Sequence, residues 1–453
     1  MARKIFISVL GTGFYEPCKY TKGSFVSSNT RFIQQATLEY LKVSTNWTTR
    51  NADDEVIDRV IILLTKGAKE FNWSQSKRTN KITGQEEDYM GLEQILQDMN
   101  LPCPVEAIDI PDGKNEEEMW AIFNSVYKTL RSNDELYFDL THSYRYLPML
   151  VLVLSNYAKF LKGVKVKHIS YGNYEARDTA SNEAPLMDIL PLTMLQDWTF
   201  AAADLIQNGN IEKLQELKKD NALIPLLRKR GQKNIDKRLA EGYLDGYIHA
   251  LKGFLDDMKL CLAPNILSGV TINRIMDCHE QVSEVFQQVI APLPPIIDRI
   301  QESMERFEIT NTMHPESIQN GYEAAKWCYD HQLYQQAITI LDENITTDFC
   351  QRLGTDERIY EQRTASNALL RWGEYREGDW EKCSDDIRER VQVSVSCSAV
   401  QDFIKLMRWD VVWLHNECRN KYNHASMGAE GMLTPADIEK LGRIILKILA
   451  RTR

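Results

Sequence analysis

The stretch Lys4–Leu10 (KIFISVL), followed at once by Gly11-Thr12-Gly13, is typical of a buried β-strand that ends in a glycine loop. Four similar segments follow, all short and rich in β-branched residues: Val60–Thr65, Val105–Ile110, Glu135–Thr141 and Val164–Tyr171. Helical patterns fill the gaps, at Thr30–Leu41, Gly91–Met99, Glu116–Ser132 and Pro148–Leu161. Strands that alternate with helices predict an α/β fold with a mostly parallel, doubly wound sheet. Asp188–Leu192 is a candidate further strand.

The strand pattern ends near Asp197, and the rest of the chain is helical in pattern. Residues 212–240 are rich in Lys, Arg, Glu and Leu, so we expect a solvated helical connector there, with a basic contact surface as the alternative. Longer periodic helices, the pattern of a bundle, follow at Gly321–Asn344, Arg358–Arg371, Ala399–Ala425 and Pro435–Ala450. We therefore expect an α/β domain at 1–196, a helical connector at 197–301 and an all-α domain at 302–453.

Composition narrows the class of protein. The chain has 453 residues, 43% hydrophobic and 26% charged, which fits a folded globular protein and excludes wholesale disorder. No apolar run approaches the roughly 18–20 residues of a membrane span, so we expect a cytoplasmic protein without a membrane partner. A net charge of -10 argues against non-specific coating of nucleic acid. The nine cysteines form no CxxC pair, which excludes zinc-ribbon and thioredoxin-like sites.

The glycine loop is the first candidate ligand-binding segment, because open parallel sheets bind ligands beyond the carboxyl ends of their strands. Gly11 and Gly13 permit close backbone approach, and Thr12 offers a hydroxyl group. The loop lacks the third glycine of a dinucleotide fingerprint and the GK[ST] of a P-loop. A standard NAD site and a P-loop site are therefore not expected.

The second candidate segment is Asp139–Pro148 (DLTHSYRYLP), where a strand runs into hydroxyl, imidazole and guanidinium groups before the next helix. Its candidate ligand-binding residues, suited to phosphates and base edges, are Thr141, His142, Ser143 and Arg145. The alternative is a helix start, with Thr141 or Ser143 as N-cap and His142 held structurally. Arg145 counts against that alternative, because an Arg at a strand-to-helix junction has no obvious capping task.

Near the C-terminus, RNKYNH supplies the candidate catalytic residues Arg419, Asn420 and His424. Metal-free RNA cleavage needs a base for the 2′-hydroxyl proton, a group that stabilises the phosphorane charge, and a proton source for the 5′-oxygen. His424 and Arg419 can supply the first two, and Asn420 could orient the His or the substrate. On an ideal helix a five-residue offset separates two side chains by about 140°, so a two-fold pair of motifs closes a site more easily than one motif.

His415 and several tryptophans leave alternatives open. His415 shares a helix face with Arg419 and is either an accessory group or a packed or solvated histidine. The tryptophans of this region are Trp372, Trp380, Trp409 and Trp413. They could stack on bases, but we expect core packing, because Trp409 and Trp413 lie one turn apart on a helix that must bury a face. The histidines show no paired-ligand spacing, so no metal site is expected.

The loop GTGFYEPCKY together with DLTHSYRYLP resembles the CARF domain (CRISPR-associated Rossmann fold) of the ancillary ribonucleases of type III CRISPR systems. RNxxxH in an α-helical C-terminal domain resembles the active-site motif of HEPN ribonucleases, and the order CARF, connector, HEPN is that of the same family. The resemblance implies a Rossmann-like CARF domain at 1–196 and a HEPN domain at 302–453.

This resemblance implies a homodimeric, or higher oligomeric, endoribonuclease of antiviral defence that cuts single-stranded RNA without metal or cofactor and leaves 2′,3′-cyclic phosphate ends. It also implies a cyclic oligoadenylate as allosteric activator; two-fold symmetry favours cyclic tetra-adenylate, with cyclic hexa-adenylate as runner-up. A non-catalytic, nucleotide-responsive regulator, whose helical half binds a partner or nucleic acid, is the rival, and the intact RNxxxH motif disfavours it. Degradation of the activator with help from Thr12, Thr141 or Ser143 stays open.

Overall fold

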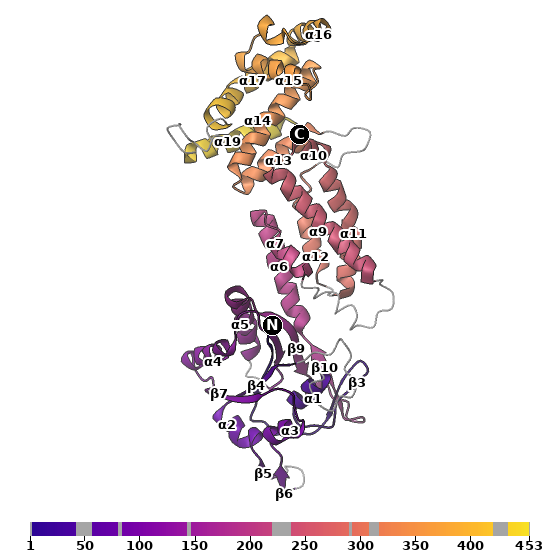
Figure 1. The fold of residues 1–453 in the computed structure, drawn as a ribbon, viewed down its shortest axis with the longest axis vertical. Coiled ribbons are helices and arrows are strands. Elements are labelled where there is room, and N and C mark those ends of the chain that lie inside the picture. The colour runs from indigo at the N-terminus through magenta and orange to yellow at the C-terminus, as the bar shows by residue number, and fades with distance from the viewer. Residues whose placement is uncertain are drawn as a thin grey trace. The chain divides into compact units, whose positions relative to one another are not determined.

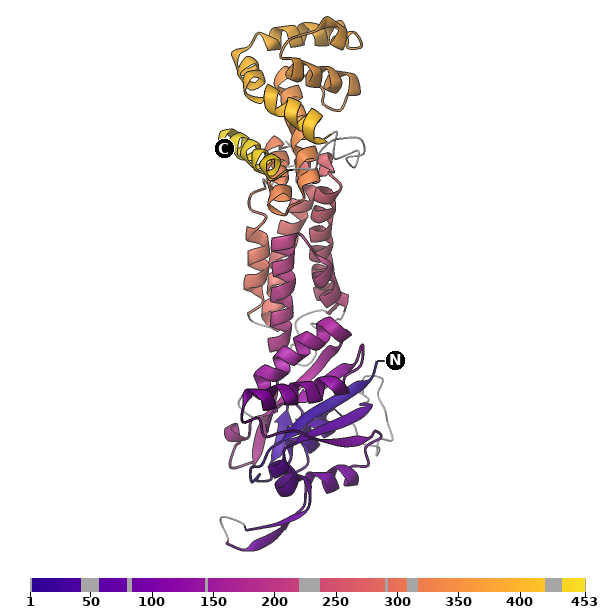
Figure 2. The same ribbon diagram turned by 90° about the vertical axis from the view of Figure 1, so that its left-hand side faces the viewer.

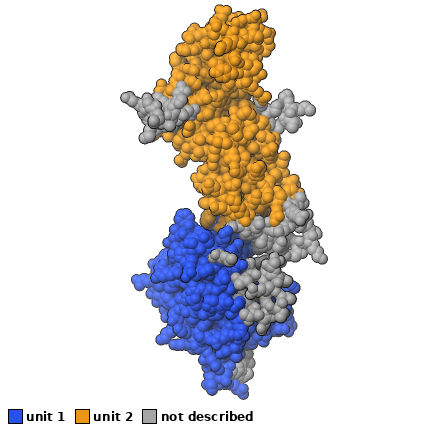
Figure 3. All heavy atoms as spheres, in the orientation of Figure 1, with its two compact units in different colours: residues 1–196 blue, residues 197–453 orange. Residues whose placement is uncertain are grey.

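The computed structural model describes residues 2–41, 57–79, 84–142, 146–219, 237–289, 292–307, 317–419 and 434–452. The chain divides into two compact units, unit 1 at Met1–Gln196 and unit 2 at Asp197–Arg453, with the boundary inside helix α6 (Leu190–Asn208) (Figure 3). Unit 1 holds an α/β sheet and the described part of unit 2 is helical, so the two predicted structural classes are confirmed. The HEPN assignment of the helical half stays a prediction.

Unit 1 is built on an eight-stranded sheet with the order β3-β2-β10-β9-β8-β1-β4-β7. Five neighbouring strands run parallel: β9 (Lys165–Gly172), β8 (Glu135–Asp139), β1 (Lys4–Leu10), β4 (Arg59–Leu64) and β7 (Val105–Asp109). All of β1 after Lys4 is buried, as expected of a central parallel strand covered on both faces. These are the five strands that the sequence predicts, with boundaries shifted by only a few residues.

Four helices cover the two faces of this sheet (Figures 1 and 2). They are α1 (Ile33–Tyr40), α3 (Leu92–Asp98), α4 (Glu116–Thr129) and α5 (Leu147–Lys162). Phe6 and Leu10 of β1 pack in one core with residues of α1 and α3. Ile7 and Val9 of the same strand face residues of α4 and α5. This alternation along one strand makes the fold doubly wound.

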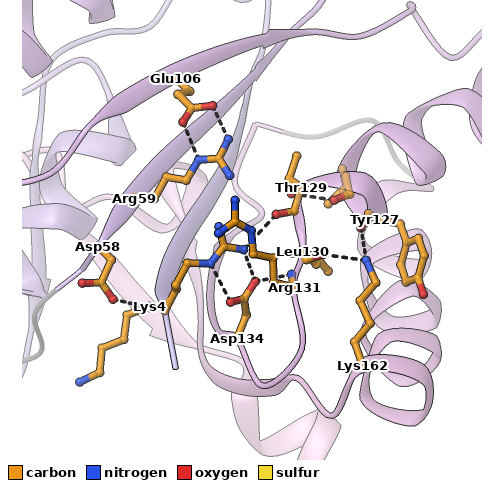
Figure 4. Close-up of polar contacts among 12 residues, drawn as sticks. Lys4, Asp58, Arg59, Glu106, Tyr127, Thr129, Leu130, Arg131, Asp134 and Lys162 are labelled. Atoms are coloured by element: carbon orange, nitrogen blue, oxygen red, sulfur yellow. Dashed lines mark hydrogen bonds and ion pairs between the residues drawn. The ribbon is translucent and has the colours of Figure 1, made fainter. Parts of the chain in front are cut away.

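Ion pairs tie together the amino ends of the parallel strands (Figure 4). Arg3 donates from Nε and Nη2 to the two carboxylate oxygens of the buried Asp134, at 3.0 and 2.7 Å. Arg59 of β4 forms a second bidentate pair with Glu106 of β7. These charge-assisted hydrogen bonds therefore hold the amino ends of the neighbouring strands together.

The candidate strand at Asp188–Leu192 is wrong. Strand β10 is Glu183–Asp188, antiparallel to β9, and α6 begins at Leu190. Asp188 Oδ1 accepts a hydrogen bond from the Leu190 backbone N–H at 3.1 Å, and Pro191 fits a first helical turn because it has no N–H to satisfy. The apolar residues after Asp188 therefore start a helix.

Four strands have no counterpart in the sequence prediction: β2 (Lys19–Lys22), β3 (Phe25–Val26), β5 (Ser76–Thr79) and β6 (Glu86–Tyr89). Three of these segments are polar, and β3 has only two residues, so none carries a hydrophobic pattern of strand length. β5 and β6 form a separate hairpin that extends away from the rest of unit 1 (Figures 1 and 2).

The described residues of unit 2 contain no strand. After α6 their helices are α7 (Glu212–Lys219), α9 (Lys237–Lys259), α10 (Ala263–Ser268), α11 (Val270–Val289), α12 (Pro294–Glu302), α13 (Ile318–Asp330), α14 (Tyr334–Leu353), α15 (Tyr360–Trp372), α16 (Asp385–Val395), α17 (Ser398–Val412) and α19 (Pro435–Thr452). No described helix is both long and apolar enough to cross a membrane.

One of the predicted long helices is divided, and another changes from an α-helix to a π-helix. Gly321–Asn344 spans α13 and α14, which are separated where Gln332 takes a left-handed backbone conformation with φ 60°. Ala399–Ala425 covers α17 and then η4 (Trp413–Arg419), a π-helix; its remaining residues lie outside the described part of the chain. α14 contacts α13, α15, α16, α17, η4 and α19, so it is the central helix of this region.

Candidate functional site

The glycine loop and the start of DLTHSYRYLP follow neighbouring strands, β1 and β8. Among the five parallel strands, the one that follows β1 in the chain is β4, on one side of β1, and the one that follows β8 is β9, on the opposite side. The carboxyl ends of these two strands therefore form the topological switch point, where open α/β sheets bind ligands. Gly11–Gly13 and Thr141–His142 meet at this point.

A buried amide holds the glycine loop. Asn72 of η1 (Lys69–Trp73), the π-helix beyond β4, donates from Nδ2 to the carbonyl oxygens of Gly11 (2.7 Å) and Gly13 (3.0 Å). A Cβ atom on Gly11 would lie 2.4 Å from Tyr15 Oη, so this position accepts only glycine without rearrangement. Thr12, between the two glycines, is exposed.

An aromatic stack joins the two loops. The rings of Tyr15 and His142 lie 3.9 Å apart between centroids with an interplanar angle of 19°. His142 Nε2 is buried and has no hydrogen-bond partner among the described residues. Burial lowers the pKa of His142 to about 4, so the ring is neutral at physiological pH. A neutral imidazole nitrogen without a partner at a switch point is a feature that a ligand can satisfy.

Thr141 is held by groups of the protein. Its Oγ1 donates to Asp139 Oδ1 at 2.6 Å and accepts from the Gly172 backbone N–H at 2.8 Å. Asp139 also accepts from Ser8 Oγ at 2.7 Å, and burial raises the pKa of this carboxyl to about 6. Thr141 is not the cap of α5, since that helix begins at Leu147. The hydroxyl therefore positions the loop after β8.

Arg31 adds positive charge beside the glycine loop. Its guanidinium carbon lies 4.4 Å from the ring centroid of Tyr89 and 5.8 Å from that of Phe14. Tyr15, Asn72 and Arg31 were not among the predicted ligand-binding residues. The sequence offers a signal only for Tyr15, which lies in the GTGFYEPCKY segment. Ser143 and Arg145, which were predicted, lie outside the described residues.

Arg419 is the described residue of the predicted catalytic motif; Asn420 and His424 lie outside the described part of the chain. Arg419 is the last residue of η4, and its guanidinium forms ion pairs with two carboxylates of α14. Nη1 lies 3.1 Å from Asp342 Oδ2, and Nη2 lies 2.6 Å from Glu343 Oε1. In this structure its charge is therefore shared with protein carboxylates.

His415 lies in the same cluster. Its Nδ1 is 3.2 Å from Asp342 Oδ2, the oxygen that also contacts Arg419. Asp342 is only 1% exposed. Of the two alternatives for His415, the structure excludes a purely solvated ring, because it makes this contact with a buried carboxylate.

Core packing of the tryptophans is confirmed for Trp380, which is fully buried, and is wrong for Trp372 and Trp409. Trp409 is 69% exposed, because α17 turns the opposite face, with Val400, Ile404 and Met407, toward the core. Arginine guanidinium groups lie over the two exposed rings, 4.0 Å from the Trp372 centroid and 4.9 Å from the Trp409 centroid.

Comparison with known proteins identifies the kind of domain in unit 1. Residues 5–175 match the family model described as CRISPR system endoribonuclease Csx1, CARF domain. The chain is also similar to the CRISPR-associated protein MJ1674 of Methanocaldococcus jannaschii, with 22% identity over 263 residues, which is 57% of this chain and 36% of the relative. The matched region thus spans about a third of that relative's length. Both matches support a CRISPR-associated protein with a CARF domain, as the sequence predicts.

Among the described residues, no group of three or more His, Cys, Asp or Glu side chains is arranged to hold a metal ion.

Proposed function

We propose that this protein is an RNA endonuclease of type III CRISPR defence that a cyclic oligoadenylate activates through unit 1. One observation carries the proposal: the segment that matches the CARF domain of an endoribonuclease brings Gly11–Gly13 and Thr141–His142 together at a topological switch point. CARF domains bind ligands of the cyclic oligoadenylate type. The unpartnered His142 Nε2 and the cation of Arg31 suit the base edges and phosphates of such a ligand.

The activator site is proposed to include Ser143 and Arg145 as well, both outside the described residues. A ring of adenylates with two-fold symmetry matches a two-fold protein site. Cyclic tetra-adenylate, lying across the dimer axis, is therefore the favoured activator, and cyclic hexa-adenylate is the runner-up.

The surface of α5 supports a homodimer. Met149 (70% exposed), Val153 (52%) and Phe160 (88%) lie on one face of this helix at helical spacing. Large apolar side chains gathered on one exposed helix face are typical of a protein–protein interface. Pairing of two copies there would bury this apolar face.

Cleavage is proposed to be metal-independent and to use Arg419 and His424 from the two subunits of the dimer. His424 would take the 2′-hydroxyl proton and Arg419 would stabilise the charge on the phosphorane, so the products would be a 2′,3′-cyclic phosphate and a 5′-hydroxyl. Arg419 would then exchange its contacts with Asp342 and Glu343, at least in part, for phosphate oxygens.

The decisive experiment mixes purified protein with a fluorescent single-stranded RNA and cyclic tri-, tetra- or hexa-adenylate in the presence of EDTA. We expect cleavage with one ring size, and His424→Ala or Arg419→Ala should lower the rate by about 10²- to 10⁴-fold. Arg352→Ala is the matched control, because Arg352 also pairs with an α14 carboxylate, Asp348, at 2.7 Å. Wild-type rates in both motif variants would disprove this catalytic assignment.

One observation favours the rival function. The two carboxylate contacts give Arg419 a structural role that needs no catalysis, as in a regulator whose helical half only binds RNA or a partner. The same assay separates the two functions: a regulator would bind RNA in response to a cyclic oligoadenylate and leave it intact.

A further inference from the structure

The environment of His415 differs from that of a structural histidine in the same unit. His331 has both ring nitrogens near backbone carbonyl oxygens, Nδ1 2.7 Å from Trp327 O and Nε2 2.9 Å from Ile206 O, so neither is open to a ligand. His415 instead has Nδ1 beside Asp342 Oδ2, and its Nε2 makes no hydrogen bond within the described part of the chain. Its side chain is 22% exposed.

This arrangement fixes the tautomer of His415. An ionised carboxylate can only accept hydrogen bonds, so the Nδ1 atom that faces Asp342 carries a proton. The second nitrogen, Nε2, then either presents a lone pair or, in the imidazolium form, donates a proton. A buried carboxylate that holds Nδ1 and leaves Nε2 available is the arrangement that acid–base histidines use.

Asp342 also places His415 beside the predicted catalytic arginine. The same Oδ2 atom lies 3.2 Å from His415 Nδ1 and 3.1 Å from Arg419 Nη1. A phosphate held by this guanidinium would therefore lie near the imidazole. The proposed mechanism assigns a base and a charge-stabilising group, and it leaves the proton source for the 5′-oxygen unassigned.

We propose that His415 is the general acid of the cleavage reaction, positioned by Asp342; this inference rests on the proposed function. The 2′-oxygen forms a bond to phosphorus as its proton passes to His424. The bond between phosphorus and the 5′-oxygen breaks, its electron pair stays on that oxygen, and Nε2 of His415 supplies the proton. The two histidines finish in exchanged protonation states, and proton exchange with water restores them.

The test replaces the leaving oxygen with sulfur. RNA with a single 5′-bridging sulfur at the scissile position releases a thiolate, which needs no protonation to leave. With the activating ring size, we expect His415→Gln to cleave ordinary RNA about 10²- to 10⁴-fold more slowly than wild type, and the sulfur-containing RNA within about tenfold of wild type. His424→Ala should be slow on both substrates, because the base is still required.

The matched control is His279→Gln. His279 also pairs with an aspartate, with Nε2 3.0 Å from Asp298 Oδ1, but it lies on α11, which packs mainly on α9, α10 and α12 and not on α14. This variant should cleave both substrates like wild type. Retained circular dichroism and activator binding would show that His415→Gln is folded.

A pH series gives a second readout. A general acid produces the alkaline limb of the rate profile, so His415→Gln should lack that limb on ordinary RNA, and wild type should lack it on the sulfur substrate. Equal losses on both substrates, or an unchanged rate on ordinary RNA, would overturn the role of His415. If wild type cleaves neither substrate with any activator, the proposed function itself fails, and this inference fails with it.

Discussion

The polar side chains at the two ends of the parallel strands in unit 1 differ in how they are paired. At the amino end, the two carboxylates of the bidentate pairs, on Asp134 and Glu106, are each matched by an arginine (Figure 4). At the carboxyl end, His142 Nε2 and Asn72 Oδ1 are buried without a hydrogen-bond partner among the described residues. Within the part of the chain that the structure describes, the buried Asp139 there is matched by hydroxyl groups and not by a cation.

The difference indicates at which end of the strands the polar groups are paired within the protein and at which end they are available to a ligand. Groups that satisfy one another add stability, whereas buried groups left unpaired cost free energy, which a bound ligand can recover by pairing with them. The amino ends of the strands are thus held together by paired side chains, whereas their carboxyl ends carry polar groups that a ligand can pair. Variants at the two ends of the strands should therefore differ in their effects on activator binding and on stability.

The largest expected effect comes from breaking the carboxyl end directly. In Gly11→Val the new side chain would displace Tyr15 from its stack on His142. We expect calorimetry to show a loss of cyclic oligoadenylate affinity of at least about 100-fold, equivalent to about 2.7 kcal/mol. Arg59→Gln, at the amino end, should bind like wild type. Equal affinities in the two variants would contradict the proposed division of roles.

Removal of the amide that holds the glycine loop should have the next largest effect. Asn72→Ala leaves two carbonyl oxygens, of Gly11 and Gly13, without their donor, which should cost about 1–3 kcal/mol of unfolding free energy and also weaken activator binding. Urea unfolding and calorimetry measure the two quantities. Asn156→Ala, which removes one amide contact to Gln196, is the control and should leave binding unchanged.

The pH dependence of stability sharpens the comparison. The Asp139 pKa, about 6 in the folded protein, exceeds the value of about 3.9 in an unfolded chain, so its contribution to stability is fully present below pH 4 and is lost as the pH rises through 6. The His142 pKa, about 4, lies below the unfolded value of about 6.5, so its contribution is present above pH 6.5 and is lost as the pH falls through 4.

These two contributions oppose each other between pH 4 and pH 6. We therefore expect Asp139→Asn to become more stable as the pH rises over this range and His142→Phe to become less stable, each by about 2 kcal/mol. Urea midpoints at closely spaced pH values provide the measurement. Slopes of the same sign in both variants would refute the assignment.

The smallest effect is expected at the amino end. The hydrogen bond from Arg59 holds the pKa of Glu106 below its usual range, so this pair adds stability above that range and loses it as the pH falls. Glu106 is 41% exposed, and solvent screens the pair. Arg59→Gln should cost less than about 1 kcal/mol at pH 7, as measured by urea unfolding. A cost above about 2 kcal/mol would show that the Arg59–Glu106 pair stabilises the domain more than its solvent exposure suggests.

Sequence patterns predicted the parts of unit 1 that bury apolar residues, such as β1 and α5, because burial produces a period that can be read along the chain. They missed β5 and β6, which are polar and in which Tyr89 is the one buried residue among the described side chains. At the candidate ligand site of unit 1, the sequence motifs indicated Gly11–Gly13 and Thr141–His142 as binding residues. Asn72 carries no such signal, since its contact with the glycine loop depends on strand order.

The same limit applies in unit 2. The motif indicated Arg419, but its partners Asp342 and Glu343 lie near the middle of α14, of which only the first part was predicted, as the end of a longer helix. Exposure of Trp409 was also not predictable from spacing alone. One turn of separation places two residues on a common face, and tertiary packing decides which face is buried.

The position of β1 in the middle of the sheet bears on how this domain is made. β1 is synthesised first, yet its contact between Ser8 and Asp139 joins residues 131 positions apart. Contacts of such separation form slowly, because a long loop must close before they form. During translation, the apolar strand β1 therefore has one edge unpaired until β8 leaves the ribosome. Chain elongation through Asp139 sets the earliest moment at which the switch point can exist.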